Sequence, residues 1–360
     1  MPDVLLFGAT GYTGALTAHA LARRGAEVVL AGRNLARLEK LAVEVEASDI
    51  RQVEVGDVDV LARAAADTKV LLTCVGPFWK LGHTAVEAAL EAGVHYVDST
   101  GEIAFVIELI ERYDAPAKER GIVMAPALGF DEVPADVALS LATEGFTGAD
   151  AVVTYSLPQR PSMGTLRTIV SGIGTRPGRW IRGGQPIDVP TASRSRWSPM
   201  PPPLGPKYAV SIPVSEGCLA PLHLDLRSLE LYAAVGQPQG VVMRAGMPFM
   251  RALAAVPPAQ GAIERLLENR RGGPGEKSRT TDRWMFLAEA RSGSLWRNVT
   301  LTGRDPYGIT AETLATGALK LAREGHESSG VIAPVEALGL ERWQKQLIDL
   351  GVDIQVYEPA

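Results

Sequence analysis

Residues 4–14 read VLLFGATGYTG, an apolar run from Val4 to Phe7 that passes directly into a glycine-rich turn. The stretch from Tyr12 to Arg24 is amphipathic and ends at Gly25, where a helix C-cap glycine belongs. A second apolar run, residues 28–31, then leads into Gly32-Arg33-Asn34. This order predicts a strand, a turn, a helix and a second strand, the unit that binds a nucleotide pyrophosphate. Glycines let the backbone approach the phosphates, and the N–H groups and dipole at the helix N-terminus attract them.

The residue at the end of the second strand indicates which dinucleotide binds. Units that prefer NAD(H) usually place Asp or Glu about 20 residues after the glycines, where it binds the ribose hydroxyls. This chain has Arg33 there, while Glu27 lies at the wrong end of the strand and Glu39 lies inside the next helix. A guanidinium matches a ribose 2′-phosphate, so we predict NADP(H). The alternative is an ordinary glycine turn beside a solvated arginine.

The composition is that of a soluble protein of enzyme size. The chain has 360 residues, 46% of them hydrophobic, which is enough for two domains with real cores. A net charge of −5 argues against nucleic acid as a partner. Cys74 and Cys218 are too few for a disulfide framework, as expected in a reducing compartment. Because the first strand is expected to begin at residue 3 or 4 and no 18-residue apolar run exists, we expect a cytoplasmic protein without signal peptide or membrane span.

Strand and helix patterns alternate over about the first 130 residues. Further strands are expected at residues 51–55, 70–75, 94–97 and 122–125. This alternation predicts an α/β fold with a Rossmann-type doubly wound parallel sheet, whose ligands bind at the carboxyl ends of the strands. The cofactor site should therefore include the residues after the third and fourth strands: Asp57, Val75, Gly76 and Pro77. Asp57 is equally well placed to bind the adenine amino group or to cap the next helix.

Five motifs, taken together and in this order, resemble the saccharopine dehydrogenase-like oxidoreductases. They are GATGYTG (8–14), AGRN (31–34), TCVGPF (73–78), HYVDSTGE (95–102) and PALGFDEVPAD (126–136). The branch that the chain resembles most is that of the trans-acting enoyl reductases of actinobacterial lipid and polyketide pathways. The resemblance is good from residue 1 to about 145 and patchy beyond, so it does not specify the substrate.

Members of this family bind NADP(H) on the glycine loop and the basic tip of the second strand. The resemblance therefore implies a cofactor site made of Gly8, Ala9, Thr10, Gly11, Tyr12, Thr13, Gly14, Arg33 and Asn34.

The second half of the chain has a different character. We predict an NADP-binding domain over residues 1–130, joined by residues 331–360, and a substrate domain over residues 131–330. Alternating apolar patterns give the second domain an α+β fold on a mostly antiparallel sheet. A basic loop is expected at about 158–206, since seven arginines and one acid, Asp188, lie between residues 160 and 196. This loop could receive an anionic substrate, or it could be a solvated loop or a dimer arm.

A methionine stripe follows in the second domain. Met243, Met247 and Met250 share one helical face, which suits core packing or a flexible wall for an acyl chain, and Pro248 favours a short or broken helix.

Several kinds of chemistry are disfavoured by what the sequence lacks. No tyrosine is followed four residues later by lysine, the pair that short-chain dehydrogenases use. The five histidines include no H-x-x-x-H pair, so no metal site is expected, and no G-x-S-x-G elbow is present. Hydride transfer remains, and it requires a proton donor or substrate anchor at a strand end.

Asp131 and Glu102 are the catalytic candidates at these strand ends, followed by Asp98, Lys80 and His83. Helix capping is the alternative role for the aspartates.

We therefore expect an NADP(H)-dependent reductase that transfers hydride to an activated C=C of an acyl or polyketide-type substrate, either a small molecule or carrier-linked. The alternatives are a C=N oxidoreductase of the saccharopine type, for which Arg160, Arg167 and Arg304 could bind carboxylates, and a non-catalytic NADP(H)-binding sensor or scaffold. A homodimer is possible in each case.

Overall fold

The computed structural model describes residues 1–157, 177–254 and 282–359. The chain divides into two compact units, each made of separate stretches of sequence. The first unit comprises Met1–Gly101, Phe105–Val133 and Pro306–Trp343, and the second comprises Glu102–Ala104, Pro134–Asp305 and Gln344–Ala360.

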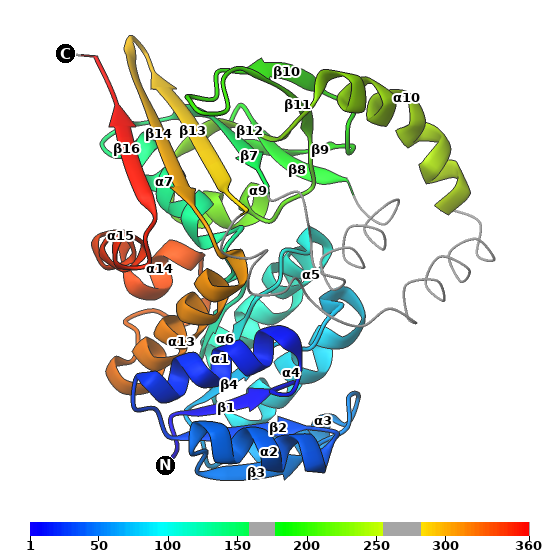
Figure 1. The fold of residues 1–360 in the computed structure, drawn as a ribbon, viewed down its shortest axis with the longest axis vertical. Coiled ribbons are helices and arrows are strands. Elements are labelled where there is room, and N and C mark those ends of the chain that lie inside the picture. The colour runs from blue at the N-terminus through cyan, green and yellow to red at the C-terminus, as the bar shows by residue number, and fades with distance from the viewer. Residues whose placement is uncertain (158–176, 255–281, 360) are drawn as a thin grey trace. The chain divides into compact units, whose positions relative to one another are not determined.

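The first unit is built on a seven-stranded sheet in which every pair of neighbouring strands is parallel. The strand order is β15-β6-β5-β4-β1-β2-β3 (Figure 1). The strands are β1 (Val4–Phe7), β2 (Val28–Gly32), β3 (Asp49–Gln52), β4 (Val70–Thr73), β5 (His95–Asp98), β6 (Val123–Ala125) and β15 (Gly330–Val331). The α/β class and the doubly wound sheet predicted from the sequence are confirmed.

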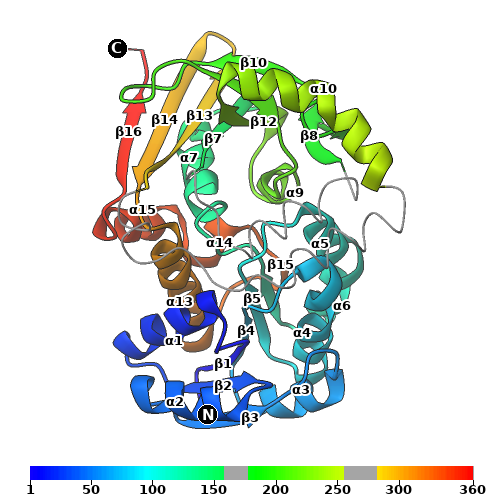
Figure 2. The same ribbon diagram turned by 45° about the vertical axis from the view of Figure 1, so that its right-hand side comes forward.

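Helices cover both faces of this sheet, and for this reason β1, β2 and β4 consist entirely of buried residues. The helices are α1 (Tyr12–Arg23), α2 (Leu35–Val45), α3 (Val58–Ala65), α4 (Phe78–Ala92), α5 (Ile103–Glu108), η1 (Leu109–Tyr113), α6 (Asp114–Glu119), α13 (Pro306–Glu324) and α14 (Pro334–Leu338). Leu5, Phe7 and Leu71 pack with residues of α3, α4 and α5 in one apolar core. Helices α1 and α13 lie side by side, and α13 also contacts β1, β4 and β5 (Figure 2).

The second unit contains a mixed, mostly antiparallel sheet with the path β10-β11-β12-β7-β13-β14-β16, and β8 pairs with β12 and β9. Its one parallel pair is β7 with β12. The strands are β7 (Ala149–Ser156), β8 (Gly178–Arg182), β9 (Gln185–Val189), β10 (Ser195–Ser198), β11 (Lys207–Ser211), β12 (Leu226–Val235), β13 (Trp284–Ser292), β14 (Leu295–Gly303) and β16 (Asp353–Tyr357). The helical segments are α7 (Val133–Thr143), α9 (Glu216–Leu219), η2 (Ala220–Leu222), α10 (Gln237–Ala254) and α15 (Leu340–Asp349). Helices α7 and α15 begin with residues that belong to the first unit.

The tail of the chain is divided differently from the sequence prediction. Residues 331–360 were expected to join the first domain; residues 331–343 do belong to the first unit, but β16 pairs antiparallel with β14 of the second sheet. Helix α13, which lies within the bounds 131–330 predicted for the second domain, belongs to the first unit. The reason is physical. Strand β16 pairs with β14 as an edge strand of the second sheet, whereas α13 covers an apolar face of the first sheet.

The basic loop predicted at 158–206 contains three strands, β8, β9 and β10, where the structure describes it. Residues 158–176, which include Arg160 and Arg167, lie outside the described residues. Beyond them, Gly183 and Gly184 both have positive φ and form the tight turn that joins β8 to β9. Trp180 is buried against Tyr232, and Arg196 pairs with Glu289 at 3.1 Å. Gly178, Trp180 and Ile181 of β8 are buried, so this stretch forms a sheet strand despite its loop-like composition.

The methionine stripe also differs from the prediction. Helix α10 continues through Pro248 instead of ending there. Met243 and Met247 are only partly buried, and Val242 and Phe249 are 70% and 71% exposed. This stretch is a helix with exposed apolar side chains, not a segment of closed core.

Two glycines in helices give a matched test of the packing. A Cβ atom at Gly82 of α4 would lie 2.5 Å from Phe105 Cζ, whereas a Cβ atom at Gly246 of α10 would meet nothing within 4 Å. We expect Gly82→Ala to lower the free energy of unfolding by about 1–3 kcal/mol through overpacking. We expect Gly246→Ala to raise it by up to about 1 kcal/mol through helix propensity. Urea unfolding of both variants measures the two signs, and equal signs would contradict this packing.

Candidate functional site

The glycine turn after β1 is packed so closely that a side chain does not fit at Gly8 or Gly14 and has little room at Gly11. A Cβ atom at Gly14 would lie 2.3 Å from the carbonyl oxygen of Gly8, and one at Gly11 would lie 3.2 Å from the same oxygen. Gly8 has φ +81°, and a Cβ atom there would lie 2.6 Å from Val75 Cγ2. These short distances show that the start of α1 lies directly against the end of β1. Because the glycines carry no side chains, the backbone is accessible where a pyrophosphate would approach. This part of the structure therefore fits the predicted dinucleotide.

The N-terminus of α1 carries no competing side-chain cap. Gly11 is the N-cap residue and, among the described residues, no side chain accepts a hydrogen bond from the first turn. No acidic residue lies in that turn either, so nothing opposes an anion at the positive end of the helix dipole. Tyr12 lies at the mouth of the turn, with its ring edge-on to Tyr307 at a centroid distance of 5.2 Å. Thr10 and Thr13 lie in the same turn, next to Ala9 at the end of β1.

Arg33 lies where the sequence predicts a 2′-phosphate contact. It follows β2 directly and is exposed, and its guanidinium has no ion-pair partner within the described part of the chain. Asn34 is the N-cap of α2, and its side chain accepts a hydrogen bond from Arg37 N at 3.0 Å. Asn34 therefore orients the start of the helix.

Arg37 was missed by the sequence reasoning. It is exposed in the first turn of α2, four residues after Arg33, and a second cation at this spacing was the signal that could have found it.

The residues after β3 and β4 have clear structural roles. Asp57 caps α3 by accepting a hydrogen bond from Val60 N at 3.0 Å, which is one of its two predicted roles. Val75 packs against Gly8 and so joins the end of β4 to the glycine turn. Gly76 is exposed, and Pro77 is the N-cap residue of α4. The carboxyl ends of β1 and β4 thus lie together, as a parallel pair requires.

Asp98, a lesser catalytic candidate, is fully used in holding the neighbouring loops. It is buried, and its carboxylate accepts hydrogen bonds from Tyr96 Oη at 2.6 Å, Thr100 N at 2.8 Å and Ala127 N at 2.9 Å. Burial and the Asp98 carboxylate raise the pKa of Tyr96 well above its ordinary value, so the phenol stays protonated and donates. Asp98 is therefore a structural anchor that fixes the loop after β6.

Asp131 lies on that anchored loop, and two glycines make room for its carboxyl group. A Cβ atom at Gly101 would lie 2.8 Å from Asp131 Oδ2, and one at Gly129 would lie 2.9 Å from Oδ1. Burial raises the pKa of Asp131 to about 6. Helix α7 begins two residues later, at Val133, whose N–H bonds to Gly129 O and not to the aspartate. Asp131 therefore does not cap the Val133 amide.

The other predicted candidates are Glu102, His83 and Lys80. Glu102 directly follows Gly101, is 8% exposed and belongs to the second unit. His83 packs on Phe105 and pairs with Glu108 at 3.0 Å within the helical layer. Lys80 is exposed in the first turn of α4.

A buried pair in the second unit was not predicted. His223 Nε2 lies 2.9 Å from Asp136 Oδ1, and the two residues are 87 positions apart in the sequence. No local pattern links residues so distant, so sequence reasoning without an alignment had no signal for the pair.

Replacing Asp98 tests its anchoring role. We expect Asp98→Asn to lower the free energy of unfolding by about 2–4 kcal/mol, because the acceptor of two backbone N–H groups loses its charge and an amide N–H₂ replaces the oxygen that accepts from Tyr96 Oη. Asp59→Asn, at an exposed position on α3, is the control and should change it by less than about 0.5 kcal/mol. Urea unfolding measures both, and similar small effects would show that Asp98 does not hold the loops.

The first sheet and its strand ends are similar to known proteins. Residues 4–124 match the family model of the saccharopine dehydrogenase NADP binding domain. The trans-acting enoyl reductase of Mycobacterium tuberculosis is 37% identical over 141 residues, which cover 38% of this chain and 34% of that protein. A lipid droplet localized protein of Caenorhabditis elegans is 30% identical over 158 residues, which cover 41% of this chain and 37% of that protein. The matched stretch thus spans about a third of the length of these curated relatives.

The whole fold also has a counterpart among solved structures. Apo saccharopine dehydrogenase (L-Glu forming) from Saccharomyces cerevisiae aligns over 100% of both chains with a TM-score of 0.61 and 14% identity, which shows a shared fold. Among the described helices, none is long and apolar enough to cross a bilayer. The family match identifies the cofactor as NADP(H), and the glycine turn after β1 fits its pyrophosphate. Over residues 4–124, about a third of its length, the chain is thus similar to the saccharopine dehydrogenase NADP binding domain.

Proposed function

We propose that this protein is an NADPH-dependent reductase of an activated C=C bond in an acyl thioester. The observation that carries the proposal is the carboxyl group of Asp131, held between Gly101 and Gly129 with a pKa raised to about 6. It lies in the loop that follows β6, and the glycine turn follows β1 of the same parallel sheet. In such sheets, ligands bind along the carboxyl ends of the strands, where both features are found. A proton donor and a dinucleotide site on one sheet edge suit hydride transfer.

The relatives favour the same class of reaction. Those with 37% identity are named trans-acting enoyl reductases, and the name supports an acyl substrate attached to a carrier. The match covers only their nucleotide-binding part, so the substrate of this chain is our inference.

Reduction of an α,β-unsaturated thioester adds a hydride at the β-carbon and a proton at the α-carbon. When bound, NADPH supplies the hydride. The glycine turn and α1 hold the pyrophosphate, and Arg33, with Arg37 beside it on α2, holds the 2′-phosphate. Asp131 delivers the proton from its carboxyl group and then takes another from water. A carboxyl group with a pKa of about 6 is protonated about a tenth of the time at pH 7, which is enough for a general acid.

The reaction class is tested by offering the purified protein NADPH with an enoyl thioester or with an imine of a 2-oxo acid. We expect NADPH oxidation with the enoyl thioester. Oxidation with the imine alone would assign the protein to C=N chemistry, and tight NADPH binding without either reaction would indicate a sensor or scaffold. The carrier-linked substrate, the homodimer and the cytoplasmic location stay predictions.

Arg33 sets the cofactor preference in this proposal. We expect Arg33→Asp to raise the Kd of NADPH about tenfold or more, because a carboxylate replaces a cation at the 2′-phosphate. The Kd of NADH, which lacks that phosphate, should change by less than about threefold. Fluorescence titration measures both constants. Arg63→Asp, at an exposed arginine of α3, is the control, and equal changes for the two cofactors would remove the assignment.

The Asp131 carboxyl group gives the reaction a defined pH dependence. Activity needs the protonated acid, so kcat should fall as pH rises through about 6. We expect Asp131→Asn to lower kcat by about a hundredfold or more and to abolish this limb of the pH profile, while the Kd of NADPH is unchanged. Steady-state kinetics across pH, with Asp59→Asn as control, measure this.

The same group predicts how stability depends on pH. Its folded pKa is raised above the unfolded value, so its contribution is fully present below the unfolded pKa and is lost as pH rises through about 6. Asp131→Asn should therefore flatten the pH dependence of Tm. A wild-type profile in both kcat and Tm would exclude Asp131 as the donor.

A further inference from the structure

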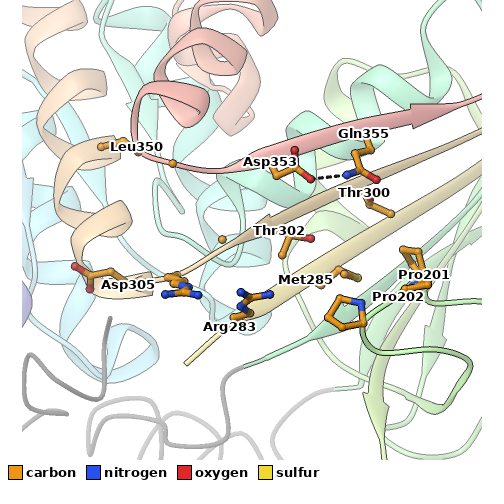
Figure 3. A pocket seen from close by; sticks show the side chains of 14 residues that line it. Pro201, Pro202, Arg283, Met285, Thr300, Thr302, Asp305, Leu350, Asp353 and Gln355 are labelled. Atoms are coloured by element: carbon orange, nitrogen blue, oxygen red, sulfur yellow. Dashed lines mark hydrogen bonds between the residues drawn. The ribbon is translucent and has the colours of Figure 1, made fainter. Parts of the chain in front are cut away.

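The second unit contains a pocket of about 620 Å³ that plays no part in the proposed reaction. A volume of this size is typical of small-molecule sites. The strands β13, β14 and β16 form its floor, and its walls are the segment Pro201–Pro203 and the turn at Leu350-Gly351 (Figure 3). Every lining residue belongs to the second unit.

The strand register explains which side chains share the floor. Met285 of β13 and Asp353 of β16 both pair with Thr302 of β14, so the three lie in one row across the sheet. Gln355 pairs with Thr300, which lies two residues before Thr302 and therefore on the same face. The floor thus presents two hydroxyl groups, an amide and a carboxylate around one thioether.

One end of the pocket carries two arginines and one carboxyl group, that of Asp305, which directly follows Arg304. Arg283 and Arg304 directly flank the terminal pair of the β13–β14 ladder, Trp284 with Gly303, and both line the pocket. Arg283 is exposed, and within the described residues it has no hydrogen-bond or ion-pair partner. Like charges at neighbouring positions of two paired strands repel each other, and an anion between them removes that cost.

The other end of the floor carries an acceptor. Gln355 donates a hydrogen bond to Asp353 Oδ2 at 2.7 Å, which orients the carboxylate within the pocket lining (Figure 3). Asp353 lies two strands away from Arg283, so the pocket has a cationic end and an acceptor end. Met285 packs in a small apolar cluster with Met200 and Leu287, which supports the proline wall.

We propose that this pocket is a binding site for a small organic anion. Its phosphate or carboxylate group is held by Arg283 and Arg304, and a hydroxyl, amide or ammonium group of the same molecule donates to Asp353. Thr300 and Thr302 hydrogen-bond the polar body between these ends. Pro201, Pro202 and Met285 contact its apolar side. The inference does not depend on the reductase proposal, since it uses no residue of the first unit.

Isothermal titration of the full chain with two simple probes tests the site. The probes are inorganic pyrophosphate for the phosphate class and citrate for the carboxylate class. Saturating NADPH is present throughout, because the glycine turn and Arg33 would otherwise bind the same anions. We expect at least one probe to bind with a stoichiometry of one per chain, and the better probe identifies the class.

Substitutions at the two ends should have opposite effects on the Kd of the bound probe. Arg283→Gln and Arg304→Gln should each raise it about tenfold, because each removes a charge-assisted contact. Asp353→Asn should lower it, because repulsion of a simple anion is removed. Arg182→Gln, an exposed arginine of β8 outside the pocket, is the control and should leave it unchanged.

Two results would overturn the proposal. One is the absence of binding by both probes at millimolar concentration. The other is binding that the two arginine variants leave unchanged, which would place the anion elsewhere. Unfolding curves of all four variants identify any loss of affinity that comes from misfolding.

Discussion

The carboxylate of Asp98 is the interaction on which the edge of the first sheet depends. It is buried and accepts three hydrogen bonds, two of them from backbone N–H groups of the loops that follow β5 and β6. A buried charge is tolerated only when its hydrogen-bonding capacity is filled, and Tyr96, Thr100 and Ala127 fill it. Because Ala127 is held in this way, with φ +62°, the chain that follows it is also fixed. The carboxyl group of Asp131 is thereby placed between two glycines.

Two acids at strand ends of this sheet have different surroundings. Asp98 has donors on both oxygens and serves as a charged acceptor. Burial raises the pKa of Asp131 to about 6, and its proposed role as proton donor rests on this property. The surroundings of each carboxyl group, and not its position after a strand, therefore distinguish an anchor from a candidate acid.

The sequence predicts the parallel sheet and the mostly antiparallel character of the second sheet, but it does not predict every strand and pairing of the second unit, for physical reasons. Fully apolar strands such as Val4–Phe7 and glycines with fixed spacing are local signals, and the strand–turn–helix order follows from them. Arg33 at the end of β2 is equally local. In contrast, β16 pairs with β14 over a separation of more than 50 residues, and nothing in its own residues names that partner. Trp180 was grouped with a basic loop because its neighbours are arginine, proline and glycine, yet Gly178, Trp180 and Ile181 of β8 are buried. The roles of Asp98 and Asp131 also looked alike in sequence, since each follows a strand, and only their donors distinguish them.

Helix α13 has a consequence for what counts as a domain in this protein. It packs along α1 and against β1, β4 and β5, although more than 180 residues separate it from β6. The stretch recognised as the NADP-binding domain, residues 4–124, ends long before this helix. Excised on its own, that stretch would leave apolar strand residues and one side of α1 in water. During synthesis, the same surface stays uncovered until residues 306–324 have been made, so the nucleotide-binding sheet closes late although most of its strands come first.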